Sequence, residues 1–283
     1  MCTKRKAVNK KKICAKMGQV MAEKVRKKKI VIITGASSGF GLEFALQLDD
    51  MFHELDEMWL IARRRERLEK LKGNLSVPAR IIAMDVTREE DILSFRSLLE
   101  RENISVRMLV NSAGFGLMGR FDKIGIEEQL QMLEVNCKAL TRITYECIPY
   151  ICRNGRILQL ASSAAFVPQK DFAIYAATKS YVLSFSRALR EELKEKSIWV
   201  TAVCPGPADT EFFERAEKYG STLAIKKLTM VSPKKVVKEA LMDSYDKKAL
   251  SVCSIPMKAF FLLTKAVPHG CILWAAGLLK SKG

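Results

Sequence analysis

The chain has 283 residues, 48% of them hydrophobic and 28% charged, a composition typical of a folded protein with one large or two small domains. Its formal net charge of +17 is unevenly distributed. Residues 1–29 hold twelve Lys or Arg and one acid, residues 247–283 hold six Lys and no acid, and residues 30–246 hold 30 of each sign. A nucleic-acid-binding domain more often carries its basic patch on the folded body, so this distribution argues against a nucleic-acid partner.

Cysteine, histidine and hydropathy exclude further classes. Eight Cys occur without a C-x-x-C pair, and with only two His the sequence predicts no metal site. Most of the Cys lie in apolar runs, which fits small buried side chains in a reducing, cytoplasmic setting. The sequence contains neither the apolar core of a secretory signal nor an uncharged apolar stretch of about 18 residues.

Residues 1–29 form a basic tail for which two interpretations stay open. Like-charged blocks repel one another and stay disordered, so the tail either lies on an anionic membrane surface or only aids solubility. Met17 and Met21 are alternative start sites, in which case part of the tail is not translated.

The body begins with Ile30–Ile33, a β-branched run that predicts a strand buried on both faces. A glycine-rich turn at 34–41 follows, and then a helical pattern over 42–48. Strand, glycine turn and helix are the context of a dinucleotide-binding turn. Backbone N–H groups can approach a phosphate there, and the helix N-terminus favours its charge. The binding residues predicted in this turn are Gly35, Ser37, Ser38, Gly39, Phe40 and Gly41.

Strands and helices alternate along the rest of the chain. Further strands are predicted at 58–62, 79–84, 106–110, 155–161, 198–204 and 249–255. Helices are predicted to about residue 72 after Arg65, over 88–102 with Thr87 as cap, over 126–152, 173–194 and 209–219, and from Ser232 and Pro233 onward, with a loop over 219–231. This alternation predicts an α/β fold: a single-domain, Rossmann-like, doubly wound parallel sheet of about seven strands with helices on both faces.

No linker composition interrupts residues 30–255, which are predicted to form one nucleotide-binding catalytic domain between the tail 1–29 and an extension 256–283. The extension has two apolar clusters, separated by Lys265, Pro268 and His269. It is too broken to span a bilayer, and it predicts a helical hairpin that lies in an interface or packs on a partner.

Tyr175 and Lys179 lie four residues apart on a predicted helix and therefore share one face. Alone, such a pair is more often a core tyrosine and a solvated lysine. Further motifs surround it in order: TGASSGFG at 34–41, NSAG at 111–114, Asn136, Ser163 and PGPADT at 205–210. Together these motifs resemble the short-chain dehydrogenase/reductase family, in its compact single-domain branch, over about residues 30–255.

The resemblance implies a nicotinamide-dependent oxidoreductase with a Ser–Tyr–Lys–Asn tetrad. Tyr175 would be the acid–base, its pKa lowered from the ordinary ~10 by Lys179 and by the positive nicotinamide ring. Lys179 would also bond the nicotinamide ribose. Ser163, preferred to Ser162 because the family has the serine second in such a pair, would donate a hydrogen bond to the substrate oxygen. Asn136 would hold a water that links Lys179 to solvent.

The residues after the second strand indicate the cofactor. A dehydrogenase that prefers NAD usually has an acid there, whereas this chain has Arg63 and Arg64, which suit a 2′-phosphate. The sequence therefore predicts NADP(H) in preference to NAD(H). The other contacts that the resemblance implies are Asp85 and Val86 at the adenine, the backbone at Asn111, Ala113 and Gly114 at the adenosine ribose, and Pro205, Gly206 and Thr210 over the nicotinamide.

Two residues depart from the family pattern. Ser112 replaces the usual second Asn after the fourth strand, which is expected to loosen a strand-to-strand bond without stopping catalysis. Phe166 replaces a frequent Gly after the serine pair, and its bulk is expected to narrow the substrate side.

The predicted function is hydride transfer between NADP(H) and a carbonyl or secondary alcohol. The basic ends and apolar extension suggest a lipophilic substrate, such as a steroid, a sterol or a long-chain keto compound. The alternative is a non-catalytic NADP(H)-binding sensor or scaffold protein. Peripheral contact with an anionic membrane through residues 1–29 and 256–283 is compatible with both. A homodimer or homotetramer through helices near 126–152 and 173–194 is expected by resemblance.

Overall fold

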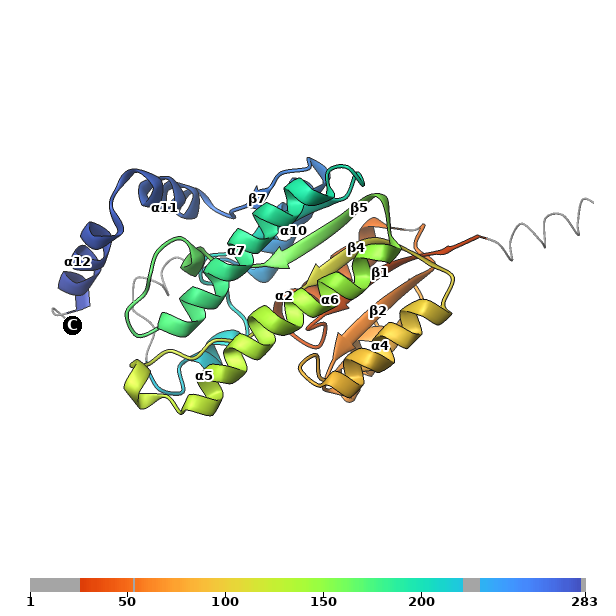
Figure 1. Cartoon of the computed structure of the whole chain (residues 1–283), viewed down its shortest axis with the longest axis horizontal. Coiled ribbons are helices and arrows are strands. Elements are labelled where there is room, and N and C mark those ends of the chain that lie inside the picture. The colour runs from red at the N-terminus through yellow and green to blue at the C-terminus, as the bar shows by residue number, and fades with distance from the viewer. Residues whose placement is uncertain (1–25, 53, 221–229, 281–283) are drawn as a thin grey trace, which may run out of the picture.

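The computed structural model describes residues 26–52, 54–220 and 230–280, and they are built around a seven-stranded sheet (Figure 1). All of its strand pairs are parallel, in the order β3-β2-β1-β4-β5-β6-β7. The strands are β1 (Lys28–Thr34), β2 (Glu57–Ala62), β3 (Ala79–Ala83), β4 (Ile104–Asn111), β5 (Ile151–Leu160), β6 (Trp199–Val203) and β7 (Leu250–Ser251). The predicted doubly wound parallel sheet is confirmed.

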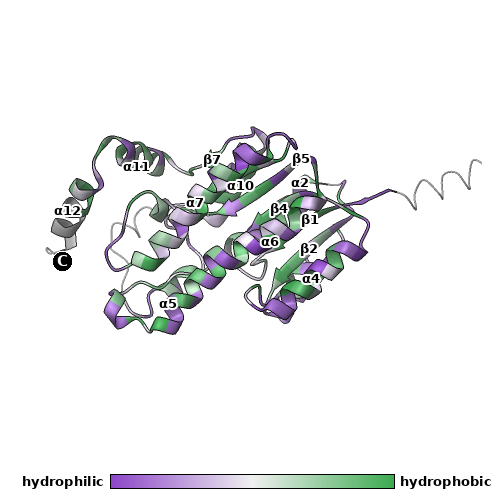
Figure 2. Ribbon diagram, in the orientation of Figure 1, coloured by the Kyte–Doolittle hydropathy of each residue, from purple (hydrophilic) through white to green (hydrophobic). Residues whose placement is uncertain are grey.

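Both faces of the sheet are covered by helices, which explains the continuous apolar runs of its strands. In β1, Val31 and Ile33 join a core with α2 (Gly39–Met51), α3 (Arg65–Lys72) and α10 (Pro233–Tyr245). Ile30 and Ile32 point the other way, into a core with α4 (Glu89–Arg101), α6 (Leu140–Cys147) and α7 (Ala173–Leu193). Figure 2 shows the hydrophobic residues concentrated in the central strands, with hydrophilic residues on the helices around them.

The order in which strands are added to the sheet reverses between β1 and β4. From β1 the chain adds β2 and β3 on one side, and it then returns to the other side of β1 to add β4 and the following strands. A crevice forms at such a switch point, beyond the carboxyl ends of the strands. The Thr34 hydroxyl, at the end of β1, accepts hydrogen bonds from the backbone N–H groups of Ser112 (3.1 Å) and Ala113 (3.2 Å). The end of β4 is therefore bonded to β1 despite the Ser at position 112.

The predicted helix over 126–152 is wrong in its continuity and its end. It is divided into α5 (Ile126–Leu133), a π-helical segment η2 (Glu134–Ala139) and α6, followed by the 3₁₀ turn η3 (Ile148–Tyr150). Pro149 lies in η3, and proline has no N–H to continue an α-helix. Strand β5 therefore begins at Ile151, earlier than the predicted 155.

Three other boundaries differ from the predictions. The strand predicted over 249–255 contains only the two residues of β7, because Ser254 has a φ of +78° and Pro256 occupies the first turn of α11 (Ile255–Ala266). The helix predicted over 209–219 is only α8 (Phe212–Ala216). Thr87 does not cap α4: its hydroxyl donates to Asp85, and Arg88 is the N-cap residue.

The start of α10 follows the prediction, since the Ser232 hydroxyl accepts from the Lys235 N–H and Pro233 is its first residue. The predicted loop 219–231 falls largely outside the described residues. The extension forms two helices, α11 and α12 (His269–Lys280). No helix in the described ranges combines the length and apolar character needed to cross a membrane. Within the same ranges, no three His, Cys, Asp or Glu side chains are grouped to hold a metal ion.

Candidate active site

The glycine turn packs closely between β1, β4 and α2. Gly35 has a φ of +69°, and a Cβ atom there would lie 2.8 Å from the Ala113 backbone nitrogen. A Cβ on Gly41 would lie 2.3 Å from the Gly35 carbonyl oxygen, so Gly41 packs the helix onto the turn. Ser38 precedes α2 without a side-chain capping bond among the described residues, and the first turn of α2 has no acid. The backbone N–H groups in the first turn of α2 therefore receive no capping bond from the Ser38 side chain, and they fit a diphosphate.

Cationic side chains lie at the end of β2, beside the glycine turn. The Arg64 guanidinium donates to the hydroxyls of Ser37 and Ser38, both at 3.3 Å. Arg63 lies 3.9 Å from the Asp85 carboxylate. Glu211, which the sequence analysis did not single out, accepts two hydrogen bonds from Arg67 (2.6 and 2.8 Å) and lies 3.6 Å from Arg64. Its carboxylate therefore competes for the cation that would bind a phosphate.

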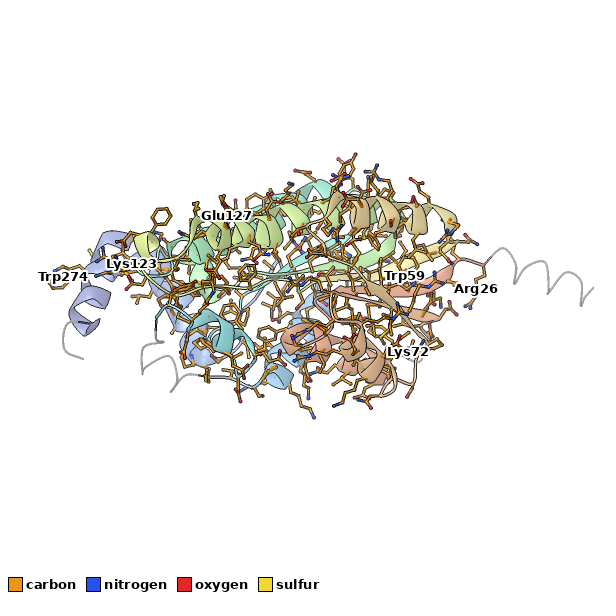
Figure 3. All side chains as sticks on the ribbon, turned by 90° about the horizontal axis from the view of Figure 1, so that it is seen from below. Arg26, Trp59, Lys72, Lys123, Glu127 and Trp274 are labelled. Carbon is orange, nitrogen blue, oxygen red and sulfur yellow. The ribbon has the colours of Figure 1, made fainter. Side chains whose placement is uncertain are left out.

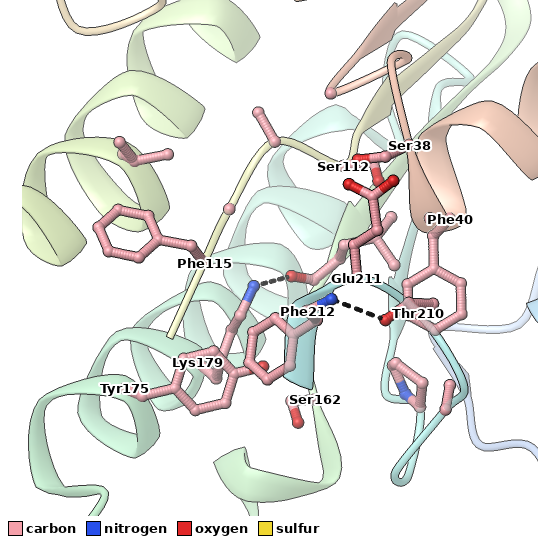
Figure 4. Close-up of a pocket in the computed structure, with 18 of the residues that line it drawn as sticks. Ser38, Phe40, Ser112, Phe115, Ser162, Tyr175, Lys179, Thr210, Glu211 and Phe212 are labelled. Atoms are coloured by element: carbon pink, nitrogen blue, oxygen red, sulfur yellow. Dashed lines mark hydrogen bonds between the residues drawn. The ribbon is translucent and has the colours of Figure 1, made fainter. Parts of the chain in front are cut away.

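A cavity of about 960 Å³ extends from this cationic end to the first two turns of α7 (Figure 4). Most of the site residues predicted from the sequence line it: Gly35, Ser37, Ser38, Gly39, Phe40, Arg63, Arg64, Asp85, Val86, Ala113, Gly114, Ser163, Tyr175, Lys179, Pro205, Gly206 and Thr210. Figure 4 shows Ser38 and Glu211 at one end of this cavity and Tyr175, Lys179 and Phe212 gathered at the other.

Gly41, Asn111 and Asn136 do not line the cavity. The Asn111 amide is buried and donates to Thr144 (2.9 Å) and Gln159 (3.0 Å) on the far side of β4. The Asn136 side chain is fully buried in η2, where it accepts from the Phe115 N–H (3.0 Å) and donates to the Phe115 carbonyl (2.8 Å). Asn136 therefore fixes the segment after β4 that leads past the site.

Tyr175 is buried against aromatic rings. Its ring stacks on Phe172 of the same helix end at a centroid distance of 4.3 Å, and Phe212 of α8 lies at 5.3 Å. Burial raises the pKa of the phenol to about 12, and its hydrogen bond to Ser162 acts in the opposite direction. The expected lowering by Lys179 is absent from this arrangement, in which the ammonium lies 5.7 Å from the ring centroid.

Both serines line the cavity, and Ser162 is the one that acts on the pKa of the Tyr175 phenol, whereas Ser163 stays the serine predicted from the sequence. The side chain of Ser162 hydrogen-bonds to the phenol and also accepts from the Ala164 N–H at 3.1 Å. Ser163 begins a 3₁₀ turn, η4 (Ser163–Ala165), and donates its backbone N–H to Pro205. Neighbouring residues at the end of a strand point in different directions, so one position decides which hydroxyl faces the phenol.

Lys179 is the buried cation of the site. Its Nζ donates to the Leu160 carbonyl at 2.6 Å, and the side chain is only 6% exposed. Burial lowers the pKa of the ammonium to about 8, although the nearby thiols of Cys137 and Cys204 oppose this change. At neutral pH Lys179 is therefore charged, and burying this charge lowers the free energy of unfolding.

The remaining wall around Tyr175, which was not predicted from the sequence, is mainly apolar, with Gln131, Gln169 and Glu214 as its polar members. It comes from separate segments: Phe115 and Met118 after β4, Phe172 before α7, Phe212 and Phe213 in α8, and Met257, Phe260 and Leu263 in α11. Phe166, which was expected to narrow the substrate side, does not line the cavity. It is buried instead and contacts Phe260 and Phe261 of α11, at centroid distances of 6.2 and 4.9 Å.

A Rossmann-like sheet with a glycine turn at its switch point and a Ser–Tyr–Lys group in the adjoining cavity defines a nicotinamide-dinucleotide oxidoreductase. The family model of the short chain dehydrogenases matches residues 29–219, and the chain belongs to this family. The matched residues include strands β1 to β6 and the glycine turn. They also include Ser162, Ser163, Tyr175 and Lys179.

Individual relatives agree with this family. The chain is 32% identical over 187 residues to a serine 3-dehydrogenase of Rhizobium radiobacter, a match that covers 64% of this chain and 73% of the relative. The structure of this chain is similar to that of a short-chain dehydrogenase from Sphingobium yanoikuyae in complex with NADPH, with a TM-score of 0.72 and 27% identity. The match covers 86% of this chain and 95% of the other. The structure is also similar to the bulky-bulky ketone specific alcohol dehydrogenase from Comamonas testosteroni (TM-score 0.65, 26% identity, 79% and 85%).

Proposed function

We propose that the protein transfers a hydride between NADP(H) and the carbonyl or secondary alcohol of a lipophilic substrate, with Tyr175 as the acid–base. The observation that carries this proposal is the arrangement of one cavity. Arg64 with Ser37 and Ser38 lies at its phosphate end, and Tyr175 with Ser162 and Lys179 lies at its apolar end.

The cofactor, when bound, supplies or accepts the hydride. The protein's part is to orient the substrate and to move one proton. In reduction, the Ser162 hydroxyl donates a hydrogen bond to the substrate oxygen as negative charge grows on it. The Tyr175 hydroxyl donates its proton to that oxygen, which as an alkoxide is a stronger base than a phenolate. The buried Lys179 ammonium would bond the nicotinamide ribose hydroxyls and so orient the cofactor beside Tyr175.

NADP(H) is favoured over NAD(H) by the charge at the end of β2. Arg64 is held beside two hydroxyls, a set of donors that suits a phosphate dianion. The position after β2 lacks the acid that would bond a ribose 2′-hydroxyl. The similar structure from Sphingobium yanoikuyae, which contains NADPH, agrees with this choice.

A lipophilic substrate is favoured by the apolar wall around Tyr175. Five aromatic rings and two methionines outnumber the three polar side chains of this part of the cavity, Gln131, Gln169 and Glu214. The similarity to a dehydrogenase specific for bulky ketones supports a large apolar carbonyl compound, such as a steroid, a sterol or a long-chain ketone.

The test is a panel of carbonyl compounds and alcohols assayed with NADPH, NADH and their oxidised forms. Tyr175→Phe should lower kcat by about 10²–10⁴-fold while cofactor binding, followed by NADPH fluorescence, is retained. Tyr181→Phe, a tyrosine on the exposed side of the same helix, is the matched control and should keep full activity. Full activity in Tyr175→Phe would overturn the mechanism, and NADPH binding without turnover of any compound would favour a sensor or scaffold.

We also retain three finer proposals. A homodimer or homotetramer through α5–α6 and α7 is supported by exposed apolar side chains there, Leu130, Tyr145 and Tyr181. A cytoplasmic location is supported by the free thiols of the described cysteines. Peripheral contact with an anionic membrane is supported by the lysines of residues 247–283.

A further inference from the structure

Helix α11 is hydrophobic on both of its sides. Its inner side packs on the body: Phe260 and Phe261 contact the buried Phe166, and Thr264 is 6% exposed. Met257 lies against Gly206, where an added Cβ would come within 2.7 Å of its sulfur. The helix is thus fixed to the body through the half that a surface helix normally buries.

Its outer side should then be polar, but it is apolar as well. Ile255, Ala259, Leu262 and Ala266 follow the spacing of one helical face, and all four are exposed. Ile255 is 83% and Leu262 65% exposed. Farther along, Trp274 of α12 is 70% exposed and projects from the end of the molecule opposite Arg26 (Figure 3). We call the residues Ile255, Ala259, Leu262 and Ala266 the α11 face.

The α11 face adjoins the catalytic cavity. Met257, Phe260 and Leu263 line that cavity, and Leu263 is also 49% exposed at the edge of the α11 face. One apolar surface therefore continues from the outside of the helix to the space beside Tyr175. A ligand that reached the α11 face in an apolar medium could enter the cavity without crossing water.

We propose that the α11 face lies in the headgroup–acyl boundary of an anionic bilayer, and that the enzyme takes its carbonyl or alcohol substrate from that bilayer. The substrate part of this inference rests on the proposed function. Exposed leucine and isoleucine side chains gain free energy by entering such a boundary, and tryptophan is favoured there.

Charge selects the bilayer over a second copy of the chain. Residues 247–283 contain six lysines and no acid, which suits anionic headgroups. Lys258 and Lys265 border the α11 face; Lys258 is paired with Glu239 (2.6 Å), and Lys265 lies 5.6 Å from the Phe261 ring centroid. A second copy placed on the same face would bring the same lysines against these, and like charges repel.

The experiment uses the full chain and two kinds of vesicle, phosphatidylcholine alone and phosphatidylcholine with phosphatidylglycerol. The wild-type protein should sediment with the anionic vesicles and not with the neutral ones. Leu262→Asp should weaken that binding by about tenfold or more, since a carboxylate is unfavourable in the boundary. Phe121→Asp, at an equally exposed apolar residue (60%) away from α11, should bind as wild type does.

Activity distinguishes the surface from the catalytic site. With cyclohexanone in solution, Leu262→Asp should turn over as the wild type does, because Leu262 does not line the cavity. With a long-chain methyl ketone dissolved in anionic vesicles, its rate should fall about tenfold. Ile255→Asp repeats both measurements if Leu262→Asp fails to fold.

Three outcomes separate the proposals. Equal sedimentation of wild type, Leu262→Asp and Ile255→Asp would overturn the docking surface. A change of oligomeric mass in Leu262→Asp, with unchanged vesicle binding, would assign the α11 face to a second copy and overturn it too. Vesicle binding that follows the prediction, in a protein that reduces no soluble or dissolved ketone, would contradict the proposed function and leave the surface supported.

Discussion

The two ends of the cavity are built in opposite ways. The cofactor end consists of backbone N–H groups, hydroxyls and arginines that come from the ends of β1, β2 and β4 and the start of α2. The substrate end consists mainly of aromatic and methionine side chains from the segments after β4 and β6 and from α7 and α11. Polar recognition of one common ligand needs fixed donors on a rigid sheet, whereas apolar binding needs only shape.

This difference has a consequence for function. The glycine turn at the cofactor end can be disturbed by one atom, because a Cβ added to Gly41 would lie 2.3 Å from the Gly35 carbonyl oxygen. An apolar wall tolerates exchange of similar side chains at a smaller cost. We therefore expect single substitutions at the polar positions to remove activity or cofactor choice, and substitutions in the wall to change substrate preference or stability.

The serine pair provides the first comparison, between two neighbouring hydroxyls. Ser162→Ala should lower kcat by about 10²–10³-fold, because it removes the hydroxyl that bonds the phenol and faces the reacting oxygen. Ser163→Ala is the matched control and should change kcat by less than about threefold. Steady-state ketone reduction with NADPH measures both, and the reverse order of the two effects would restore Ser163 to the catalytic role.

Lys179 provides the second comparison, in stability. Lys179→Met should abolish activity yet raise the free energy of unfolding at pH 7 by about 3 kcal/mol, since the ammonium pKa is about 8 in the folded protein against 10.5 for an ordinary lysine. Phe172→Ala, in the apolar wall, should lower that free energy by about 3 kcal/mol. Urea unfolding measures both changes.

The pH dependence of the same experiment has a definite sign. Between pH 8 and 10.5 the unfolded chain binds more protons at Lys179 than the folded protein does, so wild-type stability rises with pH in this window. Below pH 8 both forms are charged and the full cost is present. Lys179→Met should lack this rise, and a rise of equal size in the variant would show that other groups cause it.

Cofactor choice provides the third comparison. Arg64→Leu should raise the KM for NADPH by about 10–50-fold with little effect on the KM for NADH, because it removes a charge-assisted bond to the 2′-phosphate. Arg65→Leu is the matched control, since Arg65 pairs with Glu69 outside the cavity. Equal changes for both cofactors in Arg64→Leu would contradict the assignment.

Glu211 supplies a variant of opposite sign in the same assay. Glu211→Gln should lower the KM for NADPH a few-fold, because its carboxylate lies 3.6 Å from Arg64 and would repel a phosphate there. The KM for NADH should change little. A higher KM for NADPH would show instead that Glu211 holds the segment in its binding position through Arg67.

The sequence predicts the features that depend on local patterns, and it does not predict those that depend on contacts between distant segments. The buried strands and the glycine turn are local patterns, so the sequence predicts β1 to β6 close to their observed positions, and most of the residues predicted to contact a cofactor line one cavity. The directions of the Ser162 and Ser163 side chains, and the bonds of the Asn111 side-chain amide to Thr144 and Gln159, are not readable from the local sequence. Contacts between distant segments decide these cases, and no local pattern contains them.

The predicted ends of several helices and strands are wrong for a related reason. The apolar run 249–255 contains two residues of β7, a turn at Ser254 and the first residue of α11, and hydropathy alone does not divide it. The π-helical segment η2 (EVNCKA) contains no Gly or Pro that would indicate an interruption of the helix. Phe166 was assigned to the wrong surface because the position of α11 above it depends on tertiary packing.

An isolated β-bridge joins two segments that lie on either side of α8. Ala208 pairs with Val231 in an isolated parallel bridge, and the Val231 N–H donates to Pro207 at 3.0 Å. Pro207 and Val231 are therefore neighbours, and the described residues between them also contact the body, for example where the Met118 N–H donates to the Ala216 carbonyl (2.7 Å). Closure entropy between such joined ends grows slowly, by about 0.6 kcal/mol for each doubling of loop length. A change in the length of the connection between Pro207 and Val231 should therefore leave the register of the sheet unchanged.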